Sequence, residues 1–234
     1  MIGVVVPAHN EEALIARCLL ALKTAAAHPG LFGETVEILV VLDACDDGTG
    51  EVVRALGVHG LVVGHRNVGA ARAEGAMVLI ARGARWLAFT DADSIVDPGW
   101  LAHQLALQSE AVCGVVQVED WSDFSTEERL AYEAHYVDAE DHPHIHGANL
   151  GVSATAYLRA GGFPPIRHRE DVALVGQLEA VGATIARTNT VRVTTSPRRV
   201  GRAPDGFAGF MSRLPARAEA MAHLLLPMAP GLKT

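Results

Sequence analysis

Two aspartates one residue apart, Asp91 and Asp93, follow an apolar segment of residues 86–90. The apolar segment predicts a buried strand, and the alternation of side chains along a strand would send both carboxylates to the same side. Such a pair suits Mg²⁺ or Mn²⁺, which take one or two protein carboxylates and fill their other positions with water and substrate phosphates. The alternative is a solvated turn, so a metal site needs support from the rest of the chain.

A second candidate for chemistry is a group of four histidines, His135, His142, His144 and His146. Neutral imidazoles are common zinc ligands. However, Pro143 interrupts the segment, and alternate histidines on an irregular loop have no fixed geometry. We therefore expect a flexible loop that contacts an acceptor substrate rather than a zinc site.

The composition limits the class of protein. The chain has 234 residues and a formal charge of −8, which fits one large α/β domain and argues against nucleic-acid binding, since that needs a basic face. Its three cysteines, Cys18, Cys45 and Cys113, fit neither a disulfide framework nor a cysteine zinc site, and therefore favour the cytoplasm. Met1 leads directly into a strand, and no apolar stretch approaches the length of a membrane span, so we expect no leader and no transmembrane anchor.

The elements that must position the aspartates alternate between strands and helices. Strands are predicted at residues 2–6, 36–42, 61–63 and 86–90, each followed by a loop or helix. This alternation is typical of βαβ units and a mostly parallel sheet. Pro7 is expected to end the first strand, because proline cannot donate to a ladder, and Asn10 to cap the first helix. Ligands bind at the carboxyl ends of such strands, so the polar loops there should line one cleft.

The second half of the chain has a less regular pattern. The predicted elements are helices at residues 98–108 and 126–137, a strand at 112–118, a close-packed turn at 147–152, a helix that opens at Glu170, and two short strands before Pro197.

Seven short motifs occur in order along residues 1–200. They are residues 5–12, Asp43 with 47–49, Asn67 with 69–72 and Gly75, 91–93, 147–149, 161–163 and 170–171. Their order and spacing resemble the family 2 nucleotide-sugar glycosyltransferases. The resemblance implies an α/β fold, with a single GT-A (Rossmann-like) domain over residues 1–234 and a mostly parallel central sheet flanked by helices. Within it, the implied parts are a nucleotide-sugar-binding half (1–97), an acceptor-side half (98–200) and a helical C-terminal tail (201–234).

The resemblance also implies roles on the donor side. Asp93 would bind the metal ion directly, Asp91 would lie near the ribose or reach the ion through water, and Ala92 would be small enough to admit the donor. Asp43 would accept a hydrogen bond from a pyrimidine N–H, which favours a UDP-sugar. Arg72 would face the base or the phosphates, although by residue type alone it would be a solvated helix charge. The residues that would line the base and ribose pocket are Pro7, Ala8, His9 and Glu11.

On the acceptor side, the resemblance assigns Asp171 as the general base that takes the proton of the acceptor hydroxyl. Attack opposite the leaving group would invert the anomeric carbon. By residue type alone, Asp171 would instead stabilise a helix N-terminus. The other residues implied on this side are Gly147, Ala148, Asn149 and Glu170.

The chain departs from the family pattern at three places. Leu42 stands where the family often has the first of two aspartates, and Ala73 stands where many members have asparagine. Residues 192–202 contain no histidine, which many members supply as a metal ligand, so the third protein contact to the ion is open. In the same region Arg198, Arg199 and Arg202 could close over the diphosphate or be solvated.

These features predict an inverting, metal-dependent glycosyltransferase that uses Mn²⁺ or Mg²⁺, a nucleotide sugar (by preference a UDP-sugar) and an unidentified hydroxyl acceptor. One alternative is a sugar nucleotidyltransferase, whose usual Gly-rich opening loop is missing here. The other is a non-catalytic module that binds nucleotide sugars or glycans. Residues 214–226 have an apolar helical face that could form a homodimer or touch a membrane surface, but packing on the domain is expected.

Overall fold

The structure, a computed structural model, describes residues 1–118, 120–166, 168–195 and Leu214. Except for Leu214, the predicted tail and the cluster of Arg198, Arg199 and Arg202 lie outside the described residues. No helix of the described part is both long and apolar enough to cross a membrane.

The chain divides into two compact units. The first consists of Met1–Glu119 and Asp138–Ser196, and it contains the sheet and every site residue discussed below. The second consists of Asp120–Val137 and Pro197–Thr234. Its described helix is α5 (Thr126–His135), which begins with a capping box between Ser125 and Glu128.

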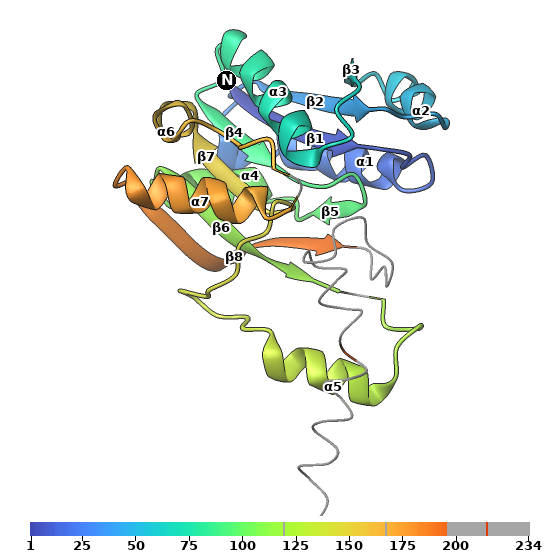
Figure 1. Cartoon of the computed structure of the whole chain (residues 1–234), viewed down its shortest axis with the longest axis vertical. Coiled ribbons are helices and arrows are strands. Elements are labelled where there is room, and N and C mark those ends of the chain that lie inside the picture. Colours follow the sequence, from blue (N-terminus) through green and yellow to red (C-terminus); the bar gives the residue numbers. More distant parts are fainter. Residues whose placement is uncertain (119, 167, 196–213, 215–234) are drawn as a thin grey trace, which may run out of the picture. The chain divides into compact units, whose positions relative to one another are not determined.

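Eight strands of the described residues form one sheet in the order β3-β2-β1-β4-β7-β6-β8-β5 (Figure 1). Strands β3, β2, β1 and β4 are parallel to one another, β6 is parallel to β8, and the remaining neighbours are antiparallel. The strands are β1 (Ile2–Ala8), β2 (Val36–Asp43), β3 (His59–Val63), β4 (Trp86–Phe89), β5 (Ser94–Val96), β6 (Ala111–Gln117), β7 (Leu150–Ser153) and β8 (Ile185–Thr195).

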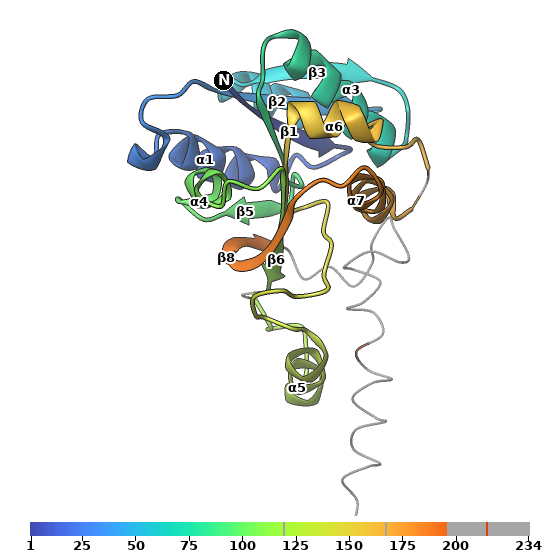
Figure 2. The ribbon, with the colours of Figure 1, turned by 90° about the vertical axis from the view of Figure 1, so that its left-hand side faces the viewer.

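Helices cover both faces of the sheet, and Figure 2 shows α1 and α4 on one side and α3, α6 and α7 on the other. The helices of this unit are α1 (Ile15–Ala26), α2 (Thr49–Ala55), α3 (Val68–Ala81), α4 (Trp100–Ala106), α6 (Ala154–Ala160) and α7 (Glu170–Ala180), with a 3₁₀ turn η1 (Pro29–Leu31). In β1, Val4 packs in the core with α1, whereas Val5 packs in the core with α3. This alternation builds two apolar layers around the sheet and confirms the predicted α/β class.

The first strand continues through Pro7, contrary to prediction. The Thr90 N–H donates to the Val5 carbonyl, so the polar groups of Val5 face β4. Pro7 lies two residues further along and faces the same way, but β4 pairs with β1 only as far as Val5. The missing N–H of Pro7 therefore costs no ladder hydrogen bond, which is how a central strand tolerates proline here.

The first helix begins at Ile15, not beside Asn10, so the predicted cap is wrong. Asn10 has a φ of 53° and pairs with the loop after β2 instead. Its side chain donates to Asp46 Oδ1 at 2.5 Å and accepts the Asp46 N–H at 2.9 Å. A contact across 36 residues thus outweighs the local capping preference.

From residue 94 onward the chain contains elements that the sequence pattern did not predict. Strand β5 and helix α6 were not expected, and the two short strands predicted before Pro197 are the single strand β8. The pairing of β8 with β6 shifts register between Gly114 and Val115. Next to this irregularity, a side chain from the residue just before β7 bonds to both strands.

That side chain belongs to Asn149, which is fully buried and joins three elements. Its Nδ2 donates to the carbonyls of Val115 (2.8 Å) and Val191 (2.9 Å), and its Oδ1 accepts the Trp100 Nε1–H at 2.8 Å. These three hydrogen bonds of the amide all go to protein groups, so its contribution to an acceptor side would be to position the loop that carries it.

We expect Asn149→Ala to lower the free energy of unfolding by about 3 kcal/mol or more, because it leaves a buried indole N–H and two buried carbonyls unpaired. Urea unfolding monitored by circular dichroism measures this loss. Asn189→Ala is the matched control, since Asn189 is only partly buried and, among the described residues, its hydrogen bonds go to Asp138 and Glu140. Equal losses for the two variants would contradict the assignment.

Candidate active site

The loops at the carboxyl ends of β1 and β2 are joined by hydrogen bonds. The His9 ring Nδ1 donates to the Asp43 carbonyl at 2.7 Å, and the Glu11 backbone N–H donates to Thr49 Oγ1 at 2.8 Å. Pro7 is partly buried, and the Ala8 side chain packs in the core. The four residues predicted to line a base and ribose pocket therefore share one edge of the sheet, where Ala8 could contact a ligand only through its backbone.

The Asp43 carboxylate is held at the end of β2 by two backbone donors. Its Oδ1 accepts the Arg66 N–H and its Oδ2 accepts the Asn67 N–H, both at 2.8 Å. Asn67 in turn caps α3 by accepting the Ala70 N–H. Asp43 is only 5% exposed, but each of its carboxylate oxygens can accept a further hydrogen bond, so it keeps acceptor capacity in a fixed orientation.

The segment that contains Asp91 and Asp93 is a turn rather than the extended strand predicted. Strand β4 ends at Phe89, and the Ser94 N–H donates to the Asp91 carbonyl at 3.1 Å, as in a β-turn. The strand geometry that was expected to place both carboxylates on the same side is therefore not present at these residues. Ala92 points into the core, so a ligand could meet it only through its backbone.

Cys18 lies beneath this turn and supports it. Its thiol donates to the Asp91 carbonyl at 3.4 Å. Burial raises the pKa of the Cys18 thiol, and the charges of Asp93 and Asp91 raise it further. The thiol is therefore protonated at neutral pH and serves as a donor, not as a nucleophile or metal ligand.

Arg72 of α3 connects this turn to the start of α7. Its Nη2 donates to Asp91 Oδ1 at 2.5 Å, and its Nη1 forms an ion pair with Glu170. The Arg72 side chain is only 4% exposed, whereas that of Asp91 is 38% exposed. Asp91 Oδ2 is the carboxylate oxygen not engaged by Arg72, so this side chain retains acceptor capacity for a ligand.

The charges around Arg72 favour its ionised form. Burial acts against the guanidinium charge, but Asp91, Glu170 and Asp171 outweigh it and raise the pKa of Arg72. Burial raises the pKa of Glu170, the attraction of Arg72 opposes this rise, and Asp171 adds to it. Glu170 is thus an internal partner of Arg72 rather than a group that faces a substrate.

Asp171 is oriented by two backbone donors at the start of α7. Its Oδ2 accepts the Gly147 N–H and its Oδ1 accepts the Val172 N–H, both at 2.8 Å. Its side chain is partly exposed, unlike the buried Glu170. Of these two adjacent carboxylates, Asp171 is therefore the one that a substrate can reach.

Close backbone packing brings α3 and α7 together. A Cβ on Gly69 would lie 2.7 Å from the Pro164 carbonyl oxygen and 3.1 Å from the Glu170 Cβ, so only glycine fits there. The Asn67 side chain donates to the Ile166 carbonyl at 3.2 Å. The start of α3 and the segment before α7, 99 residues apart at this contact, are therefore neighbours. The assignment of their motifs to one site requires this.

Phe163 is a site residue whose role the sequence did not reveal. Its ring centroid lies 5.7 Å from Arg72 Cζ, a distance at which an aromatic face attracts a buried cation. The signal available was its place in the Gly161-Gly162-Phe163 motif, but nothing in that motif indicates an arginine partner.

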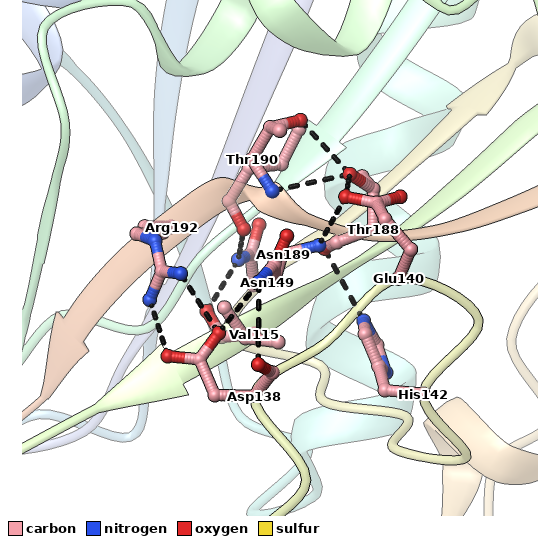
Figure 3. A network of polar contacts seen from close by, with 10 residues as sticks. Val115, Asp138, Glu140, His142, Asn149, Thr188, Asn189, Thr190 and Arg192 are labelled. Atoms are coloured by element: carbon pink, nitrogen blue, oxygen red, sulfur yellow. Dashed lines mark hydrogen bonds and ion pairs between the residues drawn. The ribbon is translucent and has the colours of Figure 1, made fainter.

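Residues 138–142, which precede Gly147 in the chain, are bound to β8 by hydrogen bonds and an ion pair. Figure 3 shows the Asp138 carboxylate paired with both terminal nitrogens of Arg192, at 2.7 and 2.8 Å, and Glu140 accepting the Thr188 hydroxyl at 2.8 Å. The His142 Nε2 lies 3.2 Å from the Thr188 carbonyl oxygen. The expectation of a loosely held loop is therefore not met along this stretch.

His142, His144 and His146 stack on one another instead of converging on a point. Their ring centroids lie 5.5 and 5.7 Å apart, with planes 25° and 20° from parallel. Burial, with the two other rings, lowers the pKa of His146 to about 3. In the described part of the chain, no three histidine, cysteine, aspartate or glutamate side chains are grouped to hold a metal ion.

Solved structures share this fold. TarS from S. aureus, residues 1–349 in complex with UDP-GlcNAc, is 15% identical with a TM-score of 0.65; the match covers 93% of this chain and 66% of that one. Mannosyltransferase PcManGT from Pyrobaculum calidifontis, in complex with GDP-Man and Mn²⁺, is 19% identical with a TM-score of 0.61, covering 97% and 76%. Glucosyl-3-phosphoglycerate synthase from Mycobacterium tuberculosis is 18% identical with a TM-score of 0.60, covering 98% and 81%.

The fold is accordingly of the GT-A type that the sequence predicted. Residues 3–157 match the model of glycosyl transferase family 2, and the chain belongs to this family. A search of curated proteins finds no match. The present chain spans about two thirds of the TarS fragment, so the activity of that protein is not transferred to it by the likeness.

Proposed function

We propose that this protein transfers a sugar from a nucleotide sugar, by preference a UDP-sugar, to a hydroxyl group with inversion at the anomeric carbon. The observation that carries the proposal is the network around Arg72, which joins the Asp91-Ala92-Asp93 turn to the start of the helix that bears Asp171. This network supports the proposal, because a displacement between two substrates requires the donor-side and acceptor-side carboxylates to share one site.

The residues present fit a hard divalent cation such as Mn²⁺ or Mg²⁺. Asp91 and Asp93 supply carboxylate oxygens from one turn and are both partly exposed, and such ions accept one or two carboxylates together with substrate phosphates. Asp93 would be the direct ligand, with Asp91 near the ribose or linked through water. When bound, the ion would neutralise the charge that grows on the diphosphate.

Asp171 would act as the general base. The acceptor oxygen forms a bond to the anomeric carbon while the bond from that carbon to the diphosphate oxygen breaks, and the acceptor proton passes to Asp171. The nucleoside diphosphate leaves with the electron pair of the broken bond. The two backbone donors of Asp171 fix the direction in which its carboxylate faces.

The donor preference rests on Asp43. Its carboxylate accepts hydrogen bonds only, so it would accept the ring N–H of uracil in a pocket shared with Pro7, Ala8, His9 and Glu11. TarS in complex with UDP-GlcNAc supports a uridine donor, whereas PcManGT in complex with GDP-Man and Mn²⁺ supports divalent metal use but has a different base.

The acceptor side would be formed by the loop of Gly147, Ala148 and Asn149. Ala148 is buried, and Asn149 contributes by anchoring the loop, because its amide is occupied within the protein.

The proposal is tested by incubating the protein with UDP-glucose, UDP-N-acetylglucosamine and GDP-mannose, with Mn²⁺ and with EDTA. We expect slow release of UDP, with water as acceptor, that EDTA abolishes. Release of pyrophosphate from a nucleoside triphosphate and a sugar phosphate would instead indicate a nucleotidyltransferase. Binding of nucleotide sugars without any turnover would indicate a non-catalytic module, and either result would overturn the proposal.

A further inference from the structure

Arg72 contacts both the turn that contains Asp91 and the start of α7, which bears Asp171. We infer that Arg72 is a positioning residue, which sets the place of Asp91 directly and that of Asp171 through Gly147, and that it does not contact the donor. This inference rests on the function proposed above. It also differs from the role that the family resemblance implies, in which Arg72 faces the base or the phosphates.

The hydrogen bonds that Arg72 already makes leave it little capacity to bind the nucleotide-sugar donor. Nη1 and Nη2 are directed at two carboxylates on different elements, Glu170 of α7 and Asp91 after β4. The Nε–H is buried and has no hydrogen-bond partner among the described residues. With only 4% of its side chain exposed, the guanidinium presents almost no surface to a ligand.

The flat face of the guanidinium determines where Gly147 lies. A Cβ built on Gly147 would be 2.7 Å from each of Cζ, Nη1 and Nη2 of Arg72. Equal distances to these three coplanar atoms place that Cβ over the plane of the group. Gly147 therefore rests on the guanidinium face, and a side chain at this position would push the loop away.

Gly147 in turn holds the proposed base. Its N–H donates to Asp171 Oδ2 at 2.8 Å, so a shift of the Gly147 backbone moves or removes one of the two donors that orient Asp171. The chain of contacts runs from Asp91 through Arg72 to Gly147 and Asp171. Only a planar, forked cation can bond two carboxylates through its edge and support a backbone with its face, so lysine is not equivalent here.

A double-mutant cycle between Gly147→Ala and Arg72→Lys tests this inference. The measurement is UDP release from UDP-glucose, or GDP release from GDP-mannose if only that donor is turned over. We expect Gly147→Ala to lower kcat by about 10²-fold in the wild type, the size of effect that a misplacement near 1 Å can have. In the Arg72→Lys background the obstructing plane is gone, so the same change should lower kcat by less than about 3-fold.

Gly176→Ala is the matched glycine control. Gly176 lies within α7, and an added Cβ would meet nothing within 4 Å. The kcat of the Gly176→Ala variant should therefore equal that of the wild type. A second readout covers the case in which Arg72→Lys does not fold. In Gly147→Ala alone, kcat should fall while the KM for the nucleotide sugar stays at its wild-type value, because the added methyl group displaces the loop that orients Asp171.

The outcomes separate this inference from the proposed function. If the wild type releases no nucleoside diphosphate, the proposed function fails, and with it the inference. If the wild type is active but the two substitutions reduce kcat additively, or Gly147→Ala raises the KM as much as it lowers kcat, only the inference is overturned. A merely structural role would lower stability without changing the kcat of the folded enzyme.

Discussion

Replacing Asp171 with asparagine is expected to lower kcat for sugar transfer by about 10²–10⁴-fold, the usual contribution of a general base, while UDP binding is retained. The amide has nearly the shape of the carboxylate, but it cannot take the acceptor proton. Both Asp171 oxygens accept a backbone N–H, and asparagine offers one acceptor oxygen, so a loss of stability of about 1 kcal/mol is also expected. Initial rates of UDP release and isothermal titration with UDP measure the two expected effects.

The control for this substitution is Glu51→Gln. Glu51 is an exposed acidic residue in the first turn of α2, so it shares the helix N-terminal position of Asp171 but lies outside the proposed site. Its variant should keep wild-type kcat. Full activity in Asp171→Asn would reject the base assignment, and Glu170 could not replace it, because Glu170 is buried against Arg72.

Much of the first half of the fold follows from local pattern. The apolar runs of β1, β2 and β4 are continuous because both faces of these parallel strands are covered by helices, and such runs are readily recognised in a sequence. The errors there concern Pro7 and Asn10, whose conformations depend on where β4 stops and on a loop 36 residues away. No local rule contains that information.

The chain from residue 94 onward was less predictable for a related reason. Strand β5 has three residues and pairs with β8, about 100 residues further along, so its short apolar segment has no meaning until β8 is placed. Asn149 was selected as part of a motif, yet its amide is used between β6, β8 and α4. A residue type alone does not distinguish a ligand contact from an internal hydrogen-bond hub.

The candidate site likewise combines features that the sequence indicated with features that it could not indicate. The resemblance to family 2 glycosyltransferases implied that Asp43, Asp91, Asp93, Glu170 and Asp171 belong to one site. The sequence could not indicate which of them are paired internally. That depends on Arg72, whose burial reverses the default interpretation of an arginine on a helix and removes Glu170 from contact with substrates.

Replacing Asp93 with alanine is expected to remove the metal dependence of the reaction and to lower kcat/KM by about 10³-fold, since charge stabilisation at a leaving group is worth several kcal/mol and each 1.36 kcal/mol is a factor of ten. Mn²⁺ binding in the presence of UDP, followed by electron paramagnetic resonance, should weaken in parallel. This second readout does not depend on turnover. It therefore distinguishes a lost ligand from a disturbed acceptor side.

Asp97→Ala is the matched control, because Asp97 lies four residues away and, within the described part of the chain, forms hydrogen bonds through its backbone alone. It should bind Mn²⁺ and release UDP as the wild type does. The described residues contain no group of three metal-ligating side chains, so Asp93 would carry most of the protein's hold on the ion, with donor phosphates completing it. Unchanged Mn²⁺ affinity in Asp93→Ala would show that the ion, if used, is held elsewhere. Loss of affinity only in the presence of UDP would indicate that protein and donor bind the ion jointly.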